Sequence, residues 1–178
     1  MLRGERVVLR PLQMDDLDRL VELLEDLEVS HRLSNDPPLP WSKTRWEAEL
    51  EEWTSEEDNT KARFAIDVDG ELVGDCTLWG IDHYRGICNV GIALGRQYWG
   101  QGFGQDAVRT LVAYAFRYLN MRKVSLEVLA DDDRAIGAYK KAGFVEEGRL
   151  RQNAWFEGRY ADALVMGLLR DEWEEAED

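Results

Sequence analysis

Three glycines at alternate positions, Gly100, Gly102 and Gly104, are the feature that most constrains this chain of 178 residues. They follow a stretch typical of a strand, 87–94, and they lead into apolar residues at helical spacing that begin at Phe103. Glycine has no Cβ atom, so backbone N–H groups in such a turn can approach a ligand closely. The first turn of the following helix adds unpaired N–H groups and a partial positive charge. The segment therefore predicts a cradle for a phosphate group.

The spacing of the glycines argues against two common phosphate loops. A dinucleotide fingerprint, G-x-G-x-x-G, that starts at Gly100 requires glycine where the chain has Gln105. Started at Gly102, the pattern ends on Ala107, and no acidic residue closes a second strand about 20 residues further on. A P-loop requires Gly-Lys before Ser or Thr, and the sequence has no such run. The spacing therefore favours a nucleotide-binding fold less than the two functions considered below.

Residues 98–107, YWGQGFGQDA, resemble the acyl-coenzyme A pyrophosphate loop of the GNAT superfamily of N-acetyltransferases. Gly102 and Gly104 fill the two glycine slots of that family's signature, whereas its Arg or Gln slot falls on Trp99. The form of the run is similar to the branch that contains the ribosomal-protein alanine acetyltransferases, called RimJ/RimL-like.

A second motif lies about thirty residues on. Residues 132–148, DDRAIGAYKKAGFVEEG, resemble the family's second cofactor-side motif, in which a helix carries Ala-Ile and a Tyr before a Gly-Phe. The resemblance runs from residues 6–12 to 166–173, and only the segment around 30–60 lacks a counterpart. It implies an α+β fold in one N-acetyltransferase domain over 1–178, with a central mixed, mostly antiparallel sheet flanked by helices. The acidic tail, 171–178, is expected to fray.

The pattern of the chain agrees with that fold. The expected helices begin at caps Asp15 and Ser42, at Phe103, and around Tyr139. The expected strands and turns are a strand at 7–9, a loop at 31–40, a hairpin of 64–68 with 72–78, strands at 87–94 and 124–129, and two C-terminal strands that turn at 156–159.

Composition bounds the class of protein. Acidic residues exceed basic ones by 36 to 22, a formal charge of -14, which argues against nucleic-acid binding and favours cationic partners. There is no apolar run near the ~20 residues that cross a bilayer and no leader-like start, so we expect a cytoplasmic protein without a membrane partner. Cys76 and Cys88 lack metal-ligand spacing and are expected to be small buried hydrophobes. No metal is expected.

The resemblance implies acetyl-CoA as the co-substrate. The residues that it assigns to acetyl-CoA are Ile92, Leu94, Trp99, Gly100, Gln101, Gly102, Phe103, Gly104, Gln105, Asp132, Arg134 and Ala135. Asp132 stands where relatives commonly have an asparagine that contacts pantetheine; it keeps the acceptor but loses the donor. Backbone N–H groups at 90–94 would polarise the thioester carbonyl, with Gly91 suited to a bulge.

The resemblance also places Tyr139 beside the thioester sulfur as the proton donor to the leaving thiolate. Many relatives carry a glutamate base where this chain has Asn89, which cannot accept a proton usefully but could orient a water or the incoming amine. The base therefore stays open. The alternatives are Asp75, Glu127, Asp82, His83 and a chain of waters to bulk solvent.

The acceptor is expected to be a primary amine on a cation: a protein N-terminus, a polyamine or an aminoglycoside-like molecule. It would lie between the 31–57 region, with its glutamate-rich face at 47–57, and the C-terminal hairpin, near Trp41, Trp46, Trp155 and Tyr160. A homodimer is compatible with the sequence. The alternative function is a catalytically degenerate acyl-CoA-binding regulatory module, which Asn89 and Asp132 favour and Tyr139 opposes.

Overall fold

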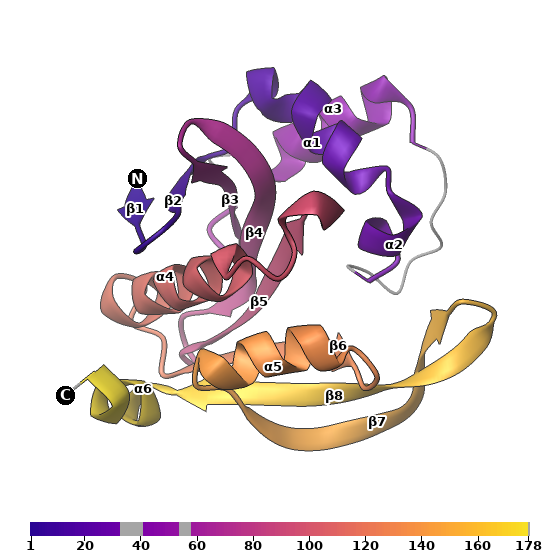
Figure 1. Ribbon diagram of the computed structural model, residues 1–178. Helices are drawn as coiled ribbons and strands as arrows, with labels where there is room; N and C mark the ends of the chain where they lie inside the picture. Colours follow the sequence, from indigo (N-terminus) through magenta and orange to yellow (C-terminus); the bar gives the residue numbers. More distant parts are fainter. Residues whose placement is uncertain (33–40, 54–57, 178) are drawn as a thin grey trace.

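The computed structural model describes residues 1–32, 41–53 and 58–177, and these form one eight-stranded sheet in the order β1-β2-β3-β4-β5-β6-β8-β7 (Figure 1). Neighbouring strands are antiparallel except β5 and β6, which are parallel. Helices flank the sheet, so the predicted α+β fold with a mixed, mostly antiparallel sheet is confirmed. The strands are β1 (Leu2–Arg3), β2 (Val8–Pro11), β3 (Ala62–Val68), β4 (Glu71–Asp82), β5 (Ile87–Leu94), β6 (Lys123–Leu129), β7 (Val145–Phe156) and β8 (Arg159–Leu169).

The four expected helices occur in the expected order, with one difference near the start of the chain and another at its end. The helical elements are η1 (Met14–Asp16), α1 (Leu17–Leu24), α2 (Leu27–Ser30), α3 (Lys43–Trp53), η2 (Arg96–Tyr98), α4 (Phe103–Arg117), α5 (Asp133–Lys141) and α6 (Arg170–Glu177). Asp15 lies inside η1 and does not cap α1. The helix expected after Asp15 is split in two, because Asp26 leaves the helical conformation and its side chain accepts the N–H of Glu28 at the start of α2. Residues 33–40 of the expected loop lie outside the described residues.

Two apolar cores lie on opposite faces of the sheet because strand side chains alternate. Cys76 and Leu78 of β4 belong to the core under α4, together with Phe116, whereas Ala93 of β5 packs with Leu20 of α1 in the second core. Cys76 and Cys88 are buried free thiols, as expected, and burial raises the pKa of Cys88 to about 12. Figure 1 shows α1 to α3 gathered at one end of the molecule and the β7–β8 hairpin reaching past the end of α5.

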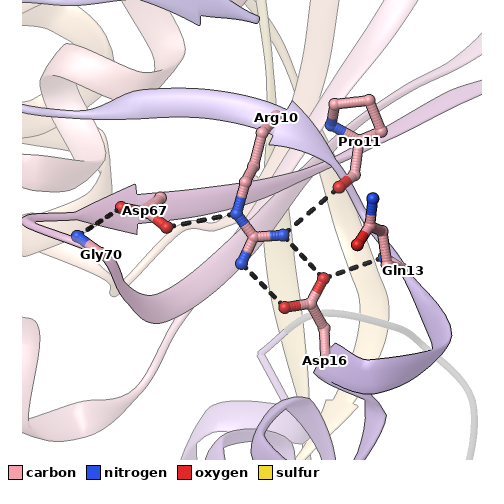
Figure 2. A network of polar contacts seen from close by, with 6 residues as sticks. All are labelled: Arg10, Pro11, Gln13, Asp16, Asp67 and Gly70. Carbon is pink, nitrogen blue, oxygen red and sulfur yellow. Dashed lines mark hydrogen bonds and ion pairs between the residues drawn. The ribbon is translucent and has the colours of Figure 1, made fainter.

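Arg10 ties the first strands to the start of α1 (Figure 2). Its guanidinium donates to both carboxylate oxygens of Asp16, each at 2.7 Å, and its Nε donates to Asp67 Oδ2 at 3.2 Å. The second oxygen of Asp67 accepts the N–H of Gly70 at 2.8 Å in the β3–β4 turn. The hydrogen bond from Arg10 holds the pKa of Asp16 below its usual value. Both carboxylates in this network therefore have all their oxygens engaged.

The parallel strands β5 and β6 pair over only three residues and then part. Ile87 to Asn89 pair with Lys123 to Ser125, and β5 beyond Asn89 has no partner on this side within the described sheet. The expected bulge at Gly91 is wrong, because the register of β5 with β4 is unbroken from Leu94 back to Asn89. The register shifts instead between Trp79 and Asp82, nearer the start of β5. Gly91 is small for another reason: a Cβ there would lie 2.8 Å from Thr77 Oγ1.

Where a frayed acidic tail is expected, the chain forms α6. Trp173 packs its ring 5.4 Å from that of Phe116, and the guanidinium carbon of Arg117 lies 4.9 Å above the Trp173 ring. These contacts join the last described helix to α4. Within the described ranges, no helix has the length and apolar character needed to cross a membrane.

The N-terminal segment is latched to the first turn of α4. The carboxylate of Asp106 accepts the backbone N–H groups of Glu5 at 3.1 Å, Arg6 at 2.8 Å and Val7 at 3.0 Å. Hydrogen bonds to a charged acceptor are stronger than those between neutral groups. The latch therefore fixes the segment before β2 against the helix that follows the glycine loop.

We predict that Asp106→Ala lowers the free energy of unfolding by about 2 kcal/mol, because three N–H groups lose their acceptor. The matched control is Asp133→Ala, which removes an exposed carboxylate from the first turn of α5 and should change stability by about 0.5 kcal/mol or less. Urea unfolding monitored by tryptophan fluorescence measures both. Equal losses in the two variants would contradict the latch.

Candidate active site

The glycine loop connects η2 to α4, and its glycines are required for two different structural reasons. Gly100 and Gly102 have φ values of +73° and +86°, in the left-handed region that side chains rarely adopt. Gly104 lies in the first turn of α4, where a Cβ would come within 3.2 Å of Leu94 Cδ1 on β5. The loop therefore turns sharply and then seats α4 directly on the strand.

The start of α4 leaves donors free for an anion. The first N–H of the helix that bonds back to the chain is that of Asp106, which donates to Gly102 O at 3.1 Å. The N–H groups of Phe103, Gly104 and Gln105 precede it and so have no partner within the helix. Together with the partial positive charge of a helix start, they fit a phosphate.

Arg6 holds the loop in place, although no motif in the sequence points to it. Its Nη1 donates to the carbonyl oxygen of Gln101, and its guanidinium carbon lies 4.7 Å from the centre of the Phe103 ring. A carbonyl and the next N–H in the same peptide plane point in opposite directions. The hold on Gln101 O therefore turns the N–H of Gly102 away from Arg6. The latch at Asp106 keeps Arg6 in this position.

A cavity of about 110 Å³ opens where β5 and β6 part. Its lining residues are Val29, Arg32, Ile92, Ala93, Leu94, Trp99, Gly104, Val108, Glu127, Val128, Leu129, Asp132, Arg134, Ala135, Ala138 and Tyr139. Eight of the predicted site residues lie in this list: Ile92, Leu94, Trp99, Gly104, Asp132, Arg134, Ala135 and Tyr139. The remaining predicted loop residues, Gly100, Gln101, Gly102, Phe103 and Gln105, form the turn and the helix start beside it. The two motifs are thus brought together around one space.

Trp99, which occupies the family's Arg or Gln slot, holds a cation from the other motif. Its Nε1 donates to Leu94 O at 2.8 Å, which fixes the indole, and the guanidinium carbon of Arg134 lies 4.0 Å above the ring. In cation–π contacts, the cation is most often an arginine and the best ring is that of tryptophan. Arg134 of α5 thus adds positive charge beside the loop. Arg96 and Arg109, which flank the loop in sequence, are engaged elsewhere: Arg96 pairs with Glu28 and Arg109 donates to Lys141 O.

Asp132 is buried and serves as the N-cap of α5. Its Oδ1 accepts the N–H of Ala135 at 3.0 Å, while Oδ2 faces Arg32 Nη1 at 3.1 Å and Arg134 Nη2 at 3.4 Å. Both oxygens are thus engaged within the protein, and two guanidinium groups balance the charge. Arg32, two residues after the end of α2, also lines the cavity, and nothing in its local sequence pattern distinguishes it from a surface arginine.

Tyr139 lies at the junction of the cavity with a second, larger space. Its ring packs at an angle against Phe144, with the centres 5.9 Å apart. Burial, and secondarily the charge of Asp132, raise the pKa of Tyr139 to about 12. The phenol is therefore protonated at neutral pH and able to donate.

The larger space is a groove of about 1410 Å³. The residues it shares with the cavity are Arg32, Ile92, Ala93, Glu127, Val128, Leu129 and Tyr139. Trp41, Trp46 and Trp155 line it, as expected, whereas Tyr160 does not. Glu49 and Glu52 of the acidic face line it as well, and Glu56 and Glu57 of that face lie outside the described residues.

The candidates for the proton acceptor separate by position. Glu127 of β6 is exposed, lines both spaces, and accepts one hydrogen bond, from Asn153 Nδ2 at 3.3 Å. Asn89 lies outside the lining of both, and its Nδ2 is 3.5 Å from Trp79 O. Asp82 and His83 also lie outside. Asp75 lines the groove but not the cavity.

A parted sheet, a glycine loop at a helix start, a protonated tyrosine and an adjoining groove together define an acyl-CoA-dependent acyltransferase. The family model described as Acetyltransferase (GNAT) domain matches residues 6–145. The chain belongs to the GNAT acetyltransferase family, and it is an acetyl-CoA-dependent N-acetyltransferase that acts on a primary amine.

Similar proteins include several acceptor types. The chain is 31% identical to an uncharacterized N-acetyltransferase p20 of Bacillus licheniformis, over 97% of each chain. It is 30% identical to a spermidine N(1)-acetyltransferase of Vibrio cholerae, covering 83% of this chain and 90% of that one. It is also 30% identical to a putative [ribosomal protein bS18]-alanine N-acetyltransferase of Bacillus subtilis, covering 94% and 98%.

Among solved structures, spermidine N-acetyltransferase from Vibrio cholerae in complex with CoA and spermine superposes with a TM-score of 0.87 at 26% identity, covering 96% of this chain and 99% of that one. The RimJ/RimL-like branch is therefore one assignment among several, while the family itself is established.

We predict that Gly102→Ala weakens acetyl-CoA binding and lowers the free energy of unfolding by about 1–2 kcal/mol, because φ is +86° and a Cβ would meet Arg6 Nη1 at 2.9 Å. The control is Gly137→Ala in α5, where nothing lies within 4 Å of the added Cβ. This variant should raise the free energy of unfolding by about 0.5–1 kcal/mol. Urea unfolding and titration calorimetry with acetyl-CoA measure both effects. Unchanged affinity in Gly102→Ala would show that the turn does not shape the donor site.

Proposed function

We propose that the chain acetylates the primary amine of a polyamine-like cation by direct attack on the thioester, with Tyr139 as the acid and Glu127 as the base. The observation that carries this proposal is the shared boundary of the two spaces. The donor cavity and the groove meet at seven residues, and among them Tyr139 carries a hydroxyl that can act as an acid and Glu127 a carboxylate that can act as a base. An amine in the groove thus reaches the end of the donor cavity.

The loop and its surroundings fit the acyl donor. Free N–H groups at the start of α4 would hold the pyrophosphate, with the Arg134 guanidinium as the nearby positive charge. The unpaired edge of β5 beyond Asn89 leaves backbone N–H groups to polarise the thioester carbonyl. Asp132 would contribute by fixing α5 and Arg32, since both of its oxygens are already engaged.

A base is needed because the amine arrives protonated. An amine with a pKa of ~10.4 is neutral about once in 10³ molecules at pH 7. Glu127 can remove its proton in the groove and pass it to solvent, and the free amine then attacks the thioester carbonyl. The amide forms as the C–S bond breaks, and the second proton lost by the nitrogen replaces the one that Tyr139 gives to the leaving sulfur. Tyr139 donates to the leaving sulfur late in that step, because a phenol with a pKa near 12 is a weaker acid than a thiol at about 8.5.

The groove favours a cation among the acceptors. Its described lining carries five carboxylates and three Arg or Lys residues, together with four tryptophans and Trp155 at the hairpin. Carboxylates attract ammonium groups, and the aromatic rings suit their methylene spacers. A protein N-terminus, the acceptor named for the B. subtilis relative, is the second candidate. That Asn89 orients a water or the incoming amine, and that the chain forms a homodimer, stay predictions.

A panel of amines distinguishes these acceptors. Spermidine, an aminoglycoside and a peptide with an N-terminal alanine are each incubated with acetyl-CoA, and thiol release is followed with a chromogenic disulfide. Release with spermidine at a kcat/KM at least about tenfold above the peptide supports a polyamine. Binding of acetyl-CoA without release across the panel would favour the degenerate module.

We predict that Tyr139→Phe lowers kcat at least about tenfold and leaves acetyl-CoA affinity nearly unchanged, because only the leaving thiolate loses its proton donor. The protonated phenol is the active form, and a pKa raised from 10 to about 12 keeps it protonated at higher pH. The wild-type rate therefore should not fall through pH 10 on account of Tyr139, and should fall only as the pH nears 12. Unchanged turnover in the variant would remove this role.

We predict that Glu127→Gln lowers kcat/KM for the amine at least about tenfold and leaves the KM for acetyl-CoA unchanged. Glutamine keeps the shape of the side chain but cannot take the proton at neutral pH. Glu146→Gln, on the exposed part of β7, is the control with the same chemical change outside both spaces. Full activity of Glu127→Gln would mean that the proton leaves by water.

A further inference from the structure

The floor of the groove contains a buried ion pair that the acetyl transfer described above does not use. Arg63 Nε on β3 donates to Asp75 Oδ2 on β4 at 2.8 Å, and the two side chains are 8% and 6% exposed. Both residues line the groove. Charged side chains this deeply buried are rare unless all their polar atoms are satisfied.

One atom of this pair has no partner. Asp75 Oδ1 is buried and accepts no hydrogen bond from the residues that the structure describes. Asp67, one strand away, shows the complete arrangement: its Oδ2 accepts from Arg10 Nε, and its Oδ1 accepts from Gly70 N (Figure 2). A buried acceptor without a hydrogen bond destabilises the folded protein by about 1–3 kcal/mol. Asp75 therefore lacks one donor in the groove floor.

The groove's own cations do not supply that donor. Lys61 Nζ pairs with Glu52 at 2.8 Å and lies over Trp53, and Arg63 already gives its Nε to the other oxygen. Arg32, the third cation of the lining, gives its Nη1 to Asp132 at 3.1 Å, and its Nε has no partner among the described residues. The unpartnered Asp75 Oδ1 fits a hydrogen-bond donor on a molecule bound in the groove. A cationic N–H is favoured, since the acceptor is a carboxylate in a lining with more acidic than basic side chains.

The position of Asp75 relates this donor to the reaction. Asp75 pairs with Ala93 across β4 and β5, and Ala93 is one of the residues shared by the groove and the donor cavity. Paired residues on adjacent strands lie about 5 Å apart. A group bound at Asp75 thus lies one short spacer away from the place where the acceptor nitrogen attacks.

We propose that Asp75 binds the second, non-reacting ammonium group of a diamine or polyamine, and so selects such substrates over monoamines. This inference rests on the proposed function, since it names the acceptor class for the same groove. The second ammonium donates to Asp75 Oδ1, while the first loses its proton near Glu127 and attacks. Asp75 is a specificity-determining residue and takes no part in the proton transfer.

The test compares putrescine with n-pentylamine, a monoamine of matched length, as acceptors for wild type and Asp75→Asn. We expect the ratio of kcat/KM for putrescine to that for n-pentylamine to fall at least about tenfold in the variant, because asparagine lacks the charge. Asp67→Asn changes the equivalent Arg–Asp pair outside the groove and should leave the ratio as in wild type. An unchanged ratio in Asp75→Asn, or an equal fall in Asp67→Asn, would overturn the proposal.

The wild-type enzyme provides a second measurement in case Asp75→Asn does not fold. It should prefer putrescine to n-pentylamine, and this preference should weaken between low and high salt, since a charge–charge contact is screened. A wild-type enzyme that uses both amines equally overturns the role of Asp75 and leaves the proposed function standing. A wild-type enzyme that releases no thiol with either amine or with spermidine refutes the proposed function itself.

Discussion

The parting of β5 from β6 after three paired residues is the constraint on which the rest of the site depends. Backbone groups inside a sheet are normally satisfied by both neighbouring strands. Here β6 continues to pair with β8 along its whole length, while β5 keeps only β4. The unpaired edge of β5 then faces the donor cavity, and the separation gives the cavity its contact with the groove. Continued pairing would close the cavity and the passage between the two spaces.

Local charge in the site is arranged against the charge of the whole molecule. A protein of formal charge -14 repels a phosphate-bearing donor, yet Arg32 and Arg134 converge on Asp132 beside the glycine loop. Trp99 replaces the usual polar residue of the family signature and holds Arg134 by its ring face. Two departures from the family pattern, at 99 and 132, thus belong to one arrangement in which an aromatic platform and a carboxylate position guanidinium groups.

The sequence predicted those parts of the fold and site that depend on local patterns. The strand at 87–94, the loop, and the helices carrying Phe103 and Tyr139 occur where glycine spacing and apolar periodicity indicate them. Contacts between remote segments could not be found this way. Arg6 reaches the loop from about a hundred residues away, and its role depends on the three N–H groups gathered by Asp106. The break between α1 and α2 was missed because a side-chain cap at Asp26 outweighs the continuing apolar stripe.

The two halves of the site come from different parts of the chain. Apart from Val29 and Arg32, every residue lining the donor cavity lies between 92 and 139, in one continuous stretch. The described outer walls of the groove come from residues within 24–32, 41–53 and 60–63 and from 154–163, near opposite ends of the chain. Substitutions at either end can therefore change which amine is accepted while the acetyl-CoA machinery stays intact. This division allows the acceptor specificity of the fold to change while the residues that bind the donor stay the same.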